Sequence, residues 1–202
     1  MTLIGHSTRQ AGLFLDALQE MGTRGWGAAR LPFQLEQVID PIRNTLIWSG
    51  GKTWMRNCQS QPLPWIEKQA QVAVVRFHTP VRVLIKRELC TNLTFENIIQ
   101  SISRRLVLLS QAYTDHTLHW DEDAVLQAAR SVRTVEQQWR YIDFERYSMT
   151  RNGKLSLAAI EGWARYEGEL TAFTPLLEAG QHIHLGKNAT IGFGHYSVVY
   201  DR

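Results

Sequence analysis

Apolar residues recur at helical spacing near the beginning of the chain. This pattern predicts an amphipathic helix that is capped by Ser7 or Thr8 and stopped by Gly22, with an apolar face made of Ala11, Phe14, Leu15, Leu18 and Met21. After a glycine-rich bend, the apolar positions alternate over residues 31–38, which predicts a strand. The chain therefore opens with one helix followed by β structure.

A hairpin and a polar connector follow this strand. Residues 45–48 are predicted to pair with residues 52–56, because the Ser-Gly-Gly sequence between them is typical of a tight turn. The connector at residues 59–64 is polar and contains proline. We expect a domain boundary close to it, with one domain in residues 1–70 and another in residues 71–202.

The second part of the chain has a longer and clearer pattern. We expect a strand at 72–77, helices at 95–109 and 121–131, two long strands at 134–147 and 155–167, a short helix at 173–178 and a final pair of strands around 185–196. Asn152-Gly153 predicts a hairpin between the two long strands, and a switch of the apolar face near Tyr141 and Ile142 predicts a bulge.

The order strand, helix, strand, strand, helix, strand is that of a ferredoxin-like domain, so the expected fold class is α+β. RNA-recognition modules share this topology, but the topology alone does not give a function. Residues 1–70 contain only a helix, a strand and a hairpin. They are similar to the second half of another ferredoxin-like domain, and we expect that the opening strand, helix and strand pair of that domain are absent from this chain.

Three glycines and a lysine lie close together near the C-terminus, in the sequence Leu-Gly-Lys-Asn-Ala-Thr-Ile-Gly-Phe-Gly-His-Tyr at residues 185–196. A glycine-rich turn can leave backbone N–H groups free to bind an anion, and Lys187 would add a positive charge to them. The pattern predicts a phosphate site. Glycines also serve hairpins and bulges in proteins that bind nothing, so this structural alternative stays open.

Several motifs in the same order resemble those of the CRISPR repeat-processing endoribonucleases, the Cas-six family of RAMP proteins. They are Arg-Phe-His-Thr-Pro-Val-Arg at 76–82, the helix with Arg104-Arg105, Trp-Arg-Tyr-Ile-Asp-Phe-Glu-Arg-Tyr at 139–147, Gly-Trp-Ala-Arg-Tyr-Glu-Gly at 162–168 and the Gly-Lys loop. The resemblance covers roughly residues 72 to 200. It implies a C-terminal ferredoxin-like RAMP domain, preceded here by a partial, N-terminally shortened one.

The resemblance also implies an activity and partners. Family members cut a repeat RNA without a metal: a 2′-hydroxyl attacks the adjacent phosphate, which leaves a 2′,3′-cyclic phosphate and a 5′-hydroxyl. The expected partners are CRISPR repeat RNA, the guide RNA made from it and other subunits of a CRISPR effector complex. Two alternatives stay open: a non-catalytic subunit that only holds the repeat-derived handle, or a fragment whose missing half a partner supplies.

Charge and cysteine content change this picture little. The net charge is only +3, but the 22 basic residues are 17 arginines and 5 lysines, and arginine suits phosphates and stacked bases. Cys58 and Cys90 have no Cys-x-x-Cys spacing, so neither a zinc site nor a disulfide framework is indicated. No signal peptide or membrane span is recognisable, and we expect a cytoplasmic protein without a cofactor.

Histidine is the natural general base for this RNA chemistry because its ordinary pKa is close to neutral. In many family members a catalytic histidine lies early in the first domain, in the part that we expect to be absent here. His6, just before the first helix, is the candidate base, with capping or exposure as the alternative. We expect packing for His78, solvent exposure for His116 and His119, and one strand face for His182 and His184, without the further ligands that a metal would need.

The predicted RNA-binding residues are glycines, cations and one histidine from several parts of the chain. For most of the cations, a solvated surface role is the alternative. Those of the loop are Gly186, Lys187, Asn188, Gly192, Gly194 and His195, and the others are Arg104, Arg105, Lys86, Arg87, Lys52 and Arg56. Large aromatics at strand spacing, Trp139, Tyr141, Trp163 and Tyr166, are expected to pack, whereas an exposed one would favour base stacking.

Overall fold

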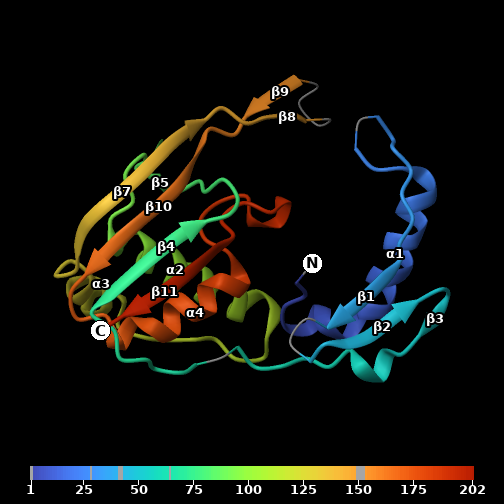
Figure 1. Ribbon diagram of the computed structural model, residues 1–202, viewed down its shortest axis with the longest axis horizontal. Coiled ribbons are helices and arrows are strands. Elements are labelled where there is room, and N and C mark those ends of the chain that lie inside the picture. The colour runs from blue at the N-terminus through green and yellow to red at the C-terminus, as the bar shows by residue number, and fades with distance from the viewer. Residues whose placement is uncertain (1, 28, 41–42, 64, 149–152) are drawn as a thin grey trace. The chain divides into compact units, whose positions relative to one another are not determined.

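The computed structural model describes residues 2–27, 29–40, 43–63, 65–148 and 153–202, and divides into two compact units (Figure 1). The N-terminal unit is Leu3–Pro62 and the C-terminal unit is Leu63–Arg202. The division therefore falls within the connector at residues 59–64, and not at residue 70. Residues 63–70 join the C-terminal unit because Lys68 N–H donates to Thr174 Oγ1 at 2.9 Å and Ala70 is buried.

The N-terminal unit contains one α-helix and a three-stranded antiparallel sheet. Its elements are the 3₁₀ helix η1 (Gly5–Gln10), α1 (Ala11–Arg24), β1 (Gln37–Asp40), β2 (Thr45–Ser49), β3 (Lys52–Thr53) and η2 (Met55–Asn57), with strand order β1-β2-β3. The predicted helix forms, but its predicted cap and stop are wrong, because Ser7 and Thr8 lie in η1 and α1 continues past Gly22 to end at Arg24. The predicted hairpin also forms, although its second strand ends at Thr53. The strand expected at 31–38 is displaced, since β1 begins only at Gln37. The chain before Gln37 folds back on the end of α1, where Phe33 N–H donates to the Gly22 carbonyl oxygen.

The C-terminal unit is built on a four-stranded antiparallel sheet in the order β11-β4-β10-β7, shown in Figure 1. Its main elements are β4 (Val72–Phe77), α2 (Phe95–Tyr113), α3 (Glu122–Ala129), β7 (Arg133–Ile142), β10 (Ala159–Glu167), α4 (Thr174–Ile183) and β11 (Tyr196–Asp201). With β4, β7, β10 and β11 as the four strands in chain order, this is the ferredoxin-like topology. The α+β class and the ferredoxin-like fold are thus confirmed.

Smaller elements decorate this frame. They are the hairpin β5 (Leu84–Ile85) with β6 (Glu88–Leu89), the hairpin β8 (Glu145–Ser148) with β9 (Gly153–Ser156), and the short helices η3 (Thr171–Phe173) and η4 (Ala189–Ile191). The β8–β9 pair agrees with a hairpin there, although Asn152 itself lies outside the described residues. No helix in the described parts of the chain is long and apolar enough to cross a membrane.

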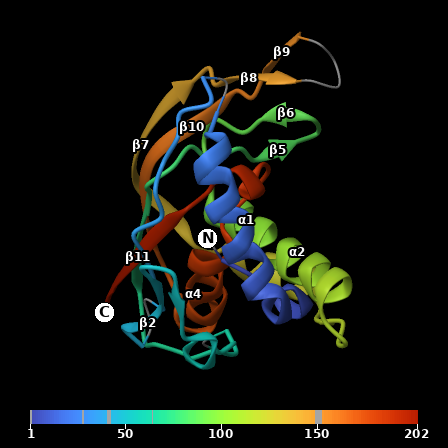
Figure 2. The ribbon, with the colours of Figure 1, turned by 90° about the vertical axis from the view of Figure 1, so that its right-hand side faces the viewer.

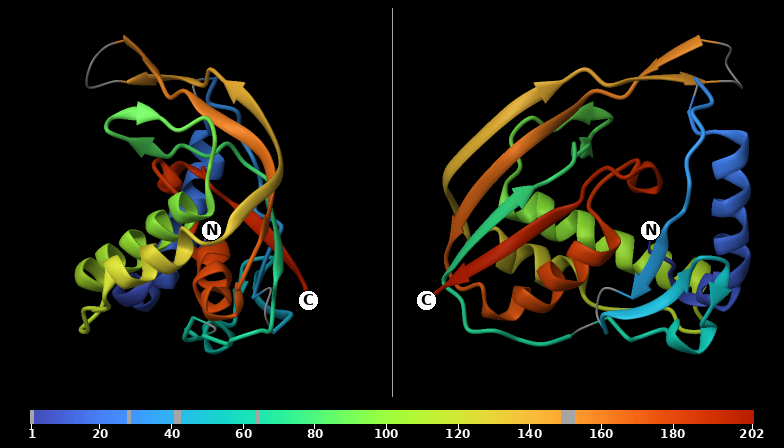
Figure 3. Two further views of the ribbon diagram at one scale, coloured as in Figure 1. Left: turned by 90° about the vertical axis from the view of Figure 1, so that its left-hand side faces the viewer. Right: turned by 45° about the vertical axis from the view of Figure 1, so that its right-hand side comes forward.

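The core of the C-terminal unit lies between the sheet and its helices. Alternation along β4 buries Ala73, Val75 and Phe77, and α2 turns a fully buried row of isoleucines toward them. Figure 3 shows α2 and α4 on the same side of the sheet. Two buried tyrosines are tied to backbone: Tyr166 Oη donates to the Leu93 carbonyl oxygen and Tyr196 Oη to that of Leu177. Burial raises the pKa of both phenols well above the usual range.

The structure differs from the predicted strands in two places. The run at 134–147 is interrupted at Asp143-Phe144, between β7 and β8, close to the predicted switch of the apolar face. The final pair of strands is wrong, because only β11 forms. Instead, α4 continues to Ile183, and residues 184–195 form an irregular loop that contains η4.

Candidate functional site

The segment from Leu185 to Gly194, which we call the glycine loop, is clamped against the chain that follows β4. Lys187 N–H donates to the Arg82 carbonyl oxygen at 2.7 Å, and Gly194 N–H donates to that of Pro80 at 2.8 Å. The loop is closed at its base, where Leu185 N–H donates to the Gly194 carbonyl oxygen at 2.9 Å. These bonds fix the loop to residues 78–82 along its length.

Close backbone packing explains why glycine is present at some positions of the loop but not at all of them. A Cβ on Gly194 would lie 1.9 Å from the Leu185 carbonyl oxygen, and one on Gly186 would lie 2.5 Å from the Arg82 carbonyl oxygen. Both positions have positive φ, so only glycine fits them without a backbone shift. Gly192 also has positive φ (94°), but its Cβ would meet nothing within 4 Å. The close backbone packing therefore accounts for two of the three glycines without a ligand.

The tip of the loop offers groups that could bind an anion. Asn188 has a left-handed backbone (φ 66°), and among the described residues no hydrogen bond uses the N–H groups of Asn188, Ala189 and Thr190. Lys187 is exposed and has no ion pair with any described acid. Free N–H groups in such a turn, next to a cation, form an anion-binding concavity. The tip has the composition of the expected phosphate site.

Three imidazoles meet where the loop joins β11. The ring centroid of His195 lies 5.2 Å from that of His78, at the end of β4, and 5.3 Å from that of His184, at the end of α4. The backbone holds two of them in place, since His195 N–H donates to Thr79 Oγ1 at 2.9 Å and His78 N–H donates to the His195 carbonyl oxygen at 2.8 Å. We call these three residues the histidine cluster.

The hydrogen bonds of the cluster define which nitrogens are available. His184 Nδ1 lies 2.9 Å from the Phe193 carbonyl oxygen, which can only accept, so a neutral His184 carries its proton on Nδ1. His78 Nε2 lies 2.8 Å from Ser197 Oγ. Among the described residues, none is hydrogen-bonded to the ring nitrogens of His195, which is exposed like His78.

The surroundings of His195 favour its neutral form. Desolvation, followed by the charges of His184 and His78, lowers the pKa of His195 from its ordinary value. Within the described residues, no group of three or more His, Cys, Asp or Glu side chains is placed to hold a metal ion. A neutral imidazole at this position can accept a proton.

Two of the predicted cations lie in the turn of the β5–β6 hairpin. Lys86 (φ 51°) and Arg87 (φ 73°) are both left-handed and exposed, and neither has an ion pair with a described acid. In Figure 2 this hairpin projects as a narrow arm. Residues other than glycine, asparagine and aspartate seldom occupy both central positions of such a turn. Two exposed cations therefore occupy a backbone conformation that is unfavourable for both of them.

The two arginines of α2 have partners inside the unit. Arg104 Nε lies 2.9 Å from Glu122 Oε1, in an exposed ion pair. Arg105 Nε donates to the Ile183 carbonyl oxygen at 2.6 Å, at the end of α4, and burial lowers the pKa of Arg105. The sequence predicted both as RNA-binding cations, and the structure gives Arg105 a structural role.

The remaining predicted residues lie in the N-terminal unit. Lys52 in β3 and Arg56 in η2 are exposed, with the half-buried Trp54 between them in the chain. His6 is exposed in η1.

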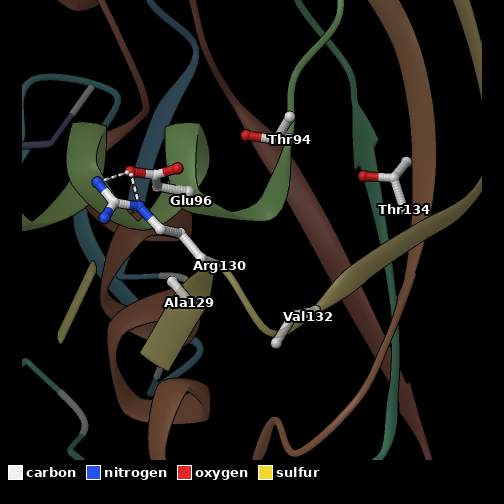
Figure 4. Close-up of a pocket in the computed structure, with 6 residues that line it drawn as sticks. All are labelled: Thr94, Glu96, Ala129, Arg130, Val132 and Thr134. Atoms are coloured by element: carbon white, nitrogen blue, oxygen red, sulfur yellow. Dashed lines mark hydrogen bonds and ion pairs between the residues drawn. The ribbon is translucent and has the colours of Figure 1, made fainter. Parts of the chain in front are cut away.

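A small pocket lies at the other end of the C-terminal sheet. It is lined by Thr94, Glu96, Ala129, Arg130, Val132 and Thr134, which Figure 4 shows as sticks. Its one cation is already paired, since Arg130 Nη2 lies 2.9 Å from Glu96 Oε1. The start of β7 forms part of this pocket, whereas the histidine cluster lies beyond the far end of β4. None of the predicted site residues lines it.

Comparison with known families accounts for most of the chain. Residues 75–196 match the family described as CRISPR-associated endoribonuclease Cas6, a stretch that includes the glycine loop, the histidine cluster up to His195 and the β5–β6 turn. The chain belongs to the Cas6 family. A second family model, described as an N-terminal domain (AF_1859_N), matches residues 1–62, which corresponds to the N-terminal unit. No curated protein matches the chain.

Solved structures of Cas6 proteins share the fold. Cas6 (TTHB231) from Thermus thermophilus, in a product complex, is 17% identical and has a TM-score of 0.59 over 92% of this chain and 70% of that one. A chain of a partial Cas6-RT-Cas1–Cas2 complex is 14% identical, with a TM-score of 0.53 over 83% of this chain and 30% of that one. This chain spans about half the length (52% and 55%) of two further Cas6 chains.

The sequence did not predict the histidine cluster. His78 was expected to pack, and His184 was placed with His182 on the face of a strand that does not form. His182 lies instead in the last turn of α4 and is exposed. The meeting of His184, His195 and His78 follows from the clamping of the loop, which has no local pattern in the sequence.

Proposed function

We propose that this chain binds CRISPR repeat RNA through one surface of its C-terminal unit. The surface consists of the glycine loop and the β5–β6 turn, with Lys187, Lys86 and Arg87 as its exposed cations. The observation that carries the proposal is the loop itself. It is fixed to residues 78–82, and Lys187 and three neighbouring N–H groups have no partner among the residues that the structure describes. This region lies within the segment that matches the Cas6 family.

The number of cations that contact RNA predicts how strongly the affinity for RNA depends on salt concentration. Each cation that contacts a phosphate of single-stranded nucleic acid contributes about −0.7 to the slope of log K against log salt. Three cations therefore predict a slope of about −2, or roughly a 20-fold loss of affinity between about 50 mM and 200 mM salt. Other cations of the chain would make the slope steeper.

We further propose that the chain processes precursor CRISPR RNA, as the description of its family indicates. The reaction is cleavage without a metal by the 2′-hydroxyl next to the scissile phosphate. Its product would stay bound as part of a guide complex with other CRISPR proteins. Binding without cleavage, as in a subunit that only holds the repeat-derived handle, is the competing outcome of the test.

The binding proposal is tested with labelled repeat RNA from the CRISPR array of the source genome, with a shuffled RNA of the same composition beside it. Lys187→Ala should weaken binding and make the salt slope less negative by about 0.7. Lys154→Ala is the matched control, because that lysine is already paired with Glu145 at 2.7 Å. Equal binding of both RNAs, or no effect of Lys187→Ala, would overturn the proposal.

A further inference from the structure

The histidine cluster lies at the base of the proposed RNA-binding loop. RNA binding alone does not explain why three imidazoles lie so close together there. We propose that His78 and His195 form the acid–base pair that cleaves the bound RNA, with His184 as a positioning residue. The inference rests on the proposed function, since it needs RNA at the loop. It assigns the chemistry to three residues of the C-terminal unit.

The geometry suits two proton transfers at one phosphate. The rings of His78 and His195 are exposed and 5.2 Å apart, so each can reach a different oxygen on the same phosphorus. Their backbones are joined, because the His195 carbonyl oxygen accepts from His78 N–H. The Ser197 hydroxyl, 2.8 Å from His78 Nε2, fixes the orientation of that ring. A pair that is held in this way needs little reorganisation when substrate binds.

The two neighbouring imidazoles favour the neutral form of His195. The ring centroids of His78 and His184 lie 5.2 Å and 5.3 Å from that of His195, close enough for a positive charge on either ring to disfavour one on His195. The titratable groups that act on His195 are His184, from the end of α4, and His78, from the end of β4. The neutral ring of His195 can accept a proton from one oxygen, and His78, when it carries a proton, can donate to another oxygen of the same phosphate.

The reaction balances with these two groups alone. The neutral imidazole accepts the proton of the 2′-hydroxyl while the 2′-oxygen forms a bond to phosphorus. The bond from phosphorus to the 5′-oxygen breaks with its electron pair, and that oxygen receives a proton from the imidazolium. The products are a 2′,3′-cyclic phosphate and a 5′-hydroxyl, and no oxidant, reductant or metal enters the balance.

His184 acts through its neighbours. Its Nδ1–H bond to the Phe193 carbonyl oxygen fixes the ring at 5.3 Å from His195, and its charge is one of the causes that lower the pKa of His195. Replacing it by asparagine keeps a donor for Phe193 but removes the charge. The pH profile of cleavage should then shift upward for the limb that belongs to His195, an effect that a merely structural role would not produce.

The test uses the full chain with 5′-labelled repeat RNA in EDTA, and follows single-turnover cleavage and binding across pH. We expect a bell-shaped rate profile for the parent, a loss of about 10²–10⁴-fold in rate for His78→Ala and for His195→Ala, and RNA affinity within a few-fold of the parent. His182→Ala, which removes an exposed histidine two positions from His184, is the matched control and should cut normally.

The outcomes separate this inference from the proposed function. If the His78 and His195 variants cut RNA at the parent rate, or if the parent binds the RNA and never cuts it, the acid–base assignment is overturned while RNA binding stands. If the parent binds no RNA even at low salt, the proposed function fails first. If a variant loses its fold, shown by loss of RNA binding, His195→Gln and His78→Asn replace the alanine variants in the same assay.

Discussion

Replacing Gly194 by alanine should destabilise the C-terminal unit much more than the same change at Gly192. At both positions alanine takes a left-handed backbone, with φ of 75° and 94°, which costs about 1–2 kcal/mol. Only at Gly194 does the new Cβ also meet backbone, 1.9 Å from the Leu185 carbonyl oxygen. Such overpacking typically adds about 1–3 kcal/mol. We therefore expect a loss of about 2–5 kcal/mol for Gly194→Ala and about 1–2 kcal/mol for Gly192→Ala.

The assay must report on the C-terminal unit alone. Hydrogen exchange of the β4 and β11 amides, measured by mass spectrometry over a urea series, gives its free energy of unfolding without a signal from the N-terminal unit. Gly194→Ala should also slow RNA cleavage, because the clamp that holds His195 beside His78 is disturbed. Equal losses for the two variants, or a neutral Gly194→Ala, would refute the idea that backbone packing sets this loop.

The remaining predictions concern charge. Lys86→Asn with Arg87→Gly should raise stability, because the turn then suits its left-handed backbone, yet weaken RNA binding and flatten its salt slope; a double variant that binds like the parent would contradict this role. Arg105→Leu should cost about 1–3 kcal/mol in a urea titration, since the carbonyl oxygen of Ile183 loses its donor, and a neutral change would argue against that structural role. Because the pKa of His195 is lowered in the folded chain, the unfolded chain takes up a proton at this residue at a higher pH than the folded chain does. The contribution of neutral His195 to the free energy of unfolding is therefore complete above about pH 6.5, and it is lost as the pH falls through the lowered pKa. Urea midpoints between about pH 8 and pH 5 should therefore fall less steeply in His195→Gln, and an unchanged slope would refute the assignment.

The ferredoxin-like core could be predicted from the sequence because strand alternation and helix capping agree with the tertiary structure. β4 lies where alternation placed it, Thr94 and Asp121 cap α2 and α3 through their side chains, and the acids of the first turn of α3 favour its start. The strand order then follows from the sequence of elements. Here periodicity and burial point to the same answer.

Only part of the candidate site could be predicted from the sequence. The glycine loop was identified, but as a turn between strands, whereas hydrogen bonds to residues 78–82 hold it in an irregular form. These bonds join residues more than 100 positions apart, and nothing in the local pattern of either segment specifies them. For the same reason His78 did not stand out, since its importance comes from His195. Arg105 was expected to be fully exposed, and it is half-buried because the end of α4, which its distance from the apolar stripe does not reveal, lies against it.

The central claim is that this chain binds CRISPR repeat RNA and cuts it without a metal. One reaction tests it most directly: the purified chain is incubated in EDTA with labelled repeat RNA, and the same sample is resolved on a native and a denaturing gel. The account predicts a retained complex on the first gel and, on the second, a single cut whose 5′ fragment ends in a 2′,3′-cyclic phosphate. Neither a shift nor a cut, or the same behaviour with a shuffled RNA, would contradict it.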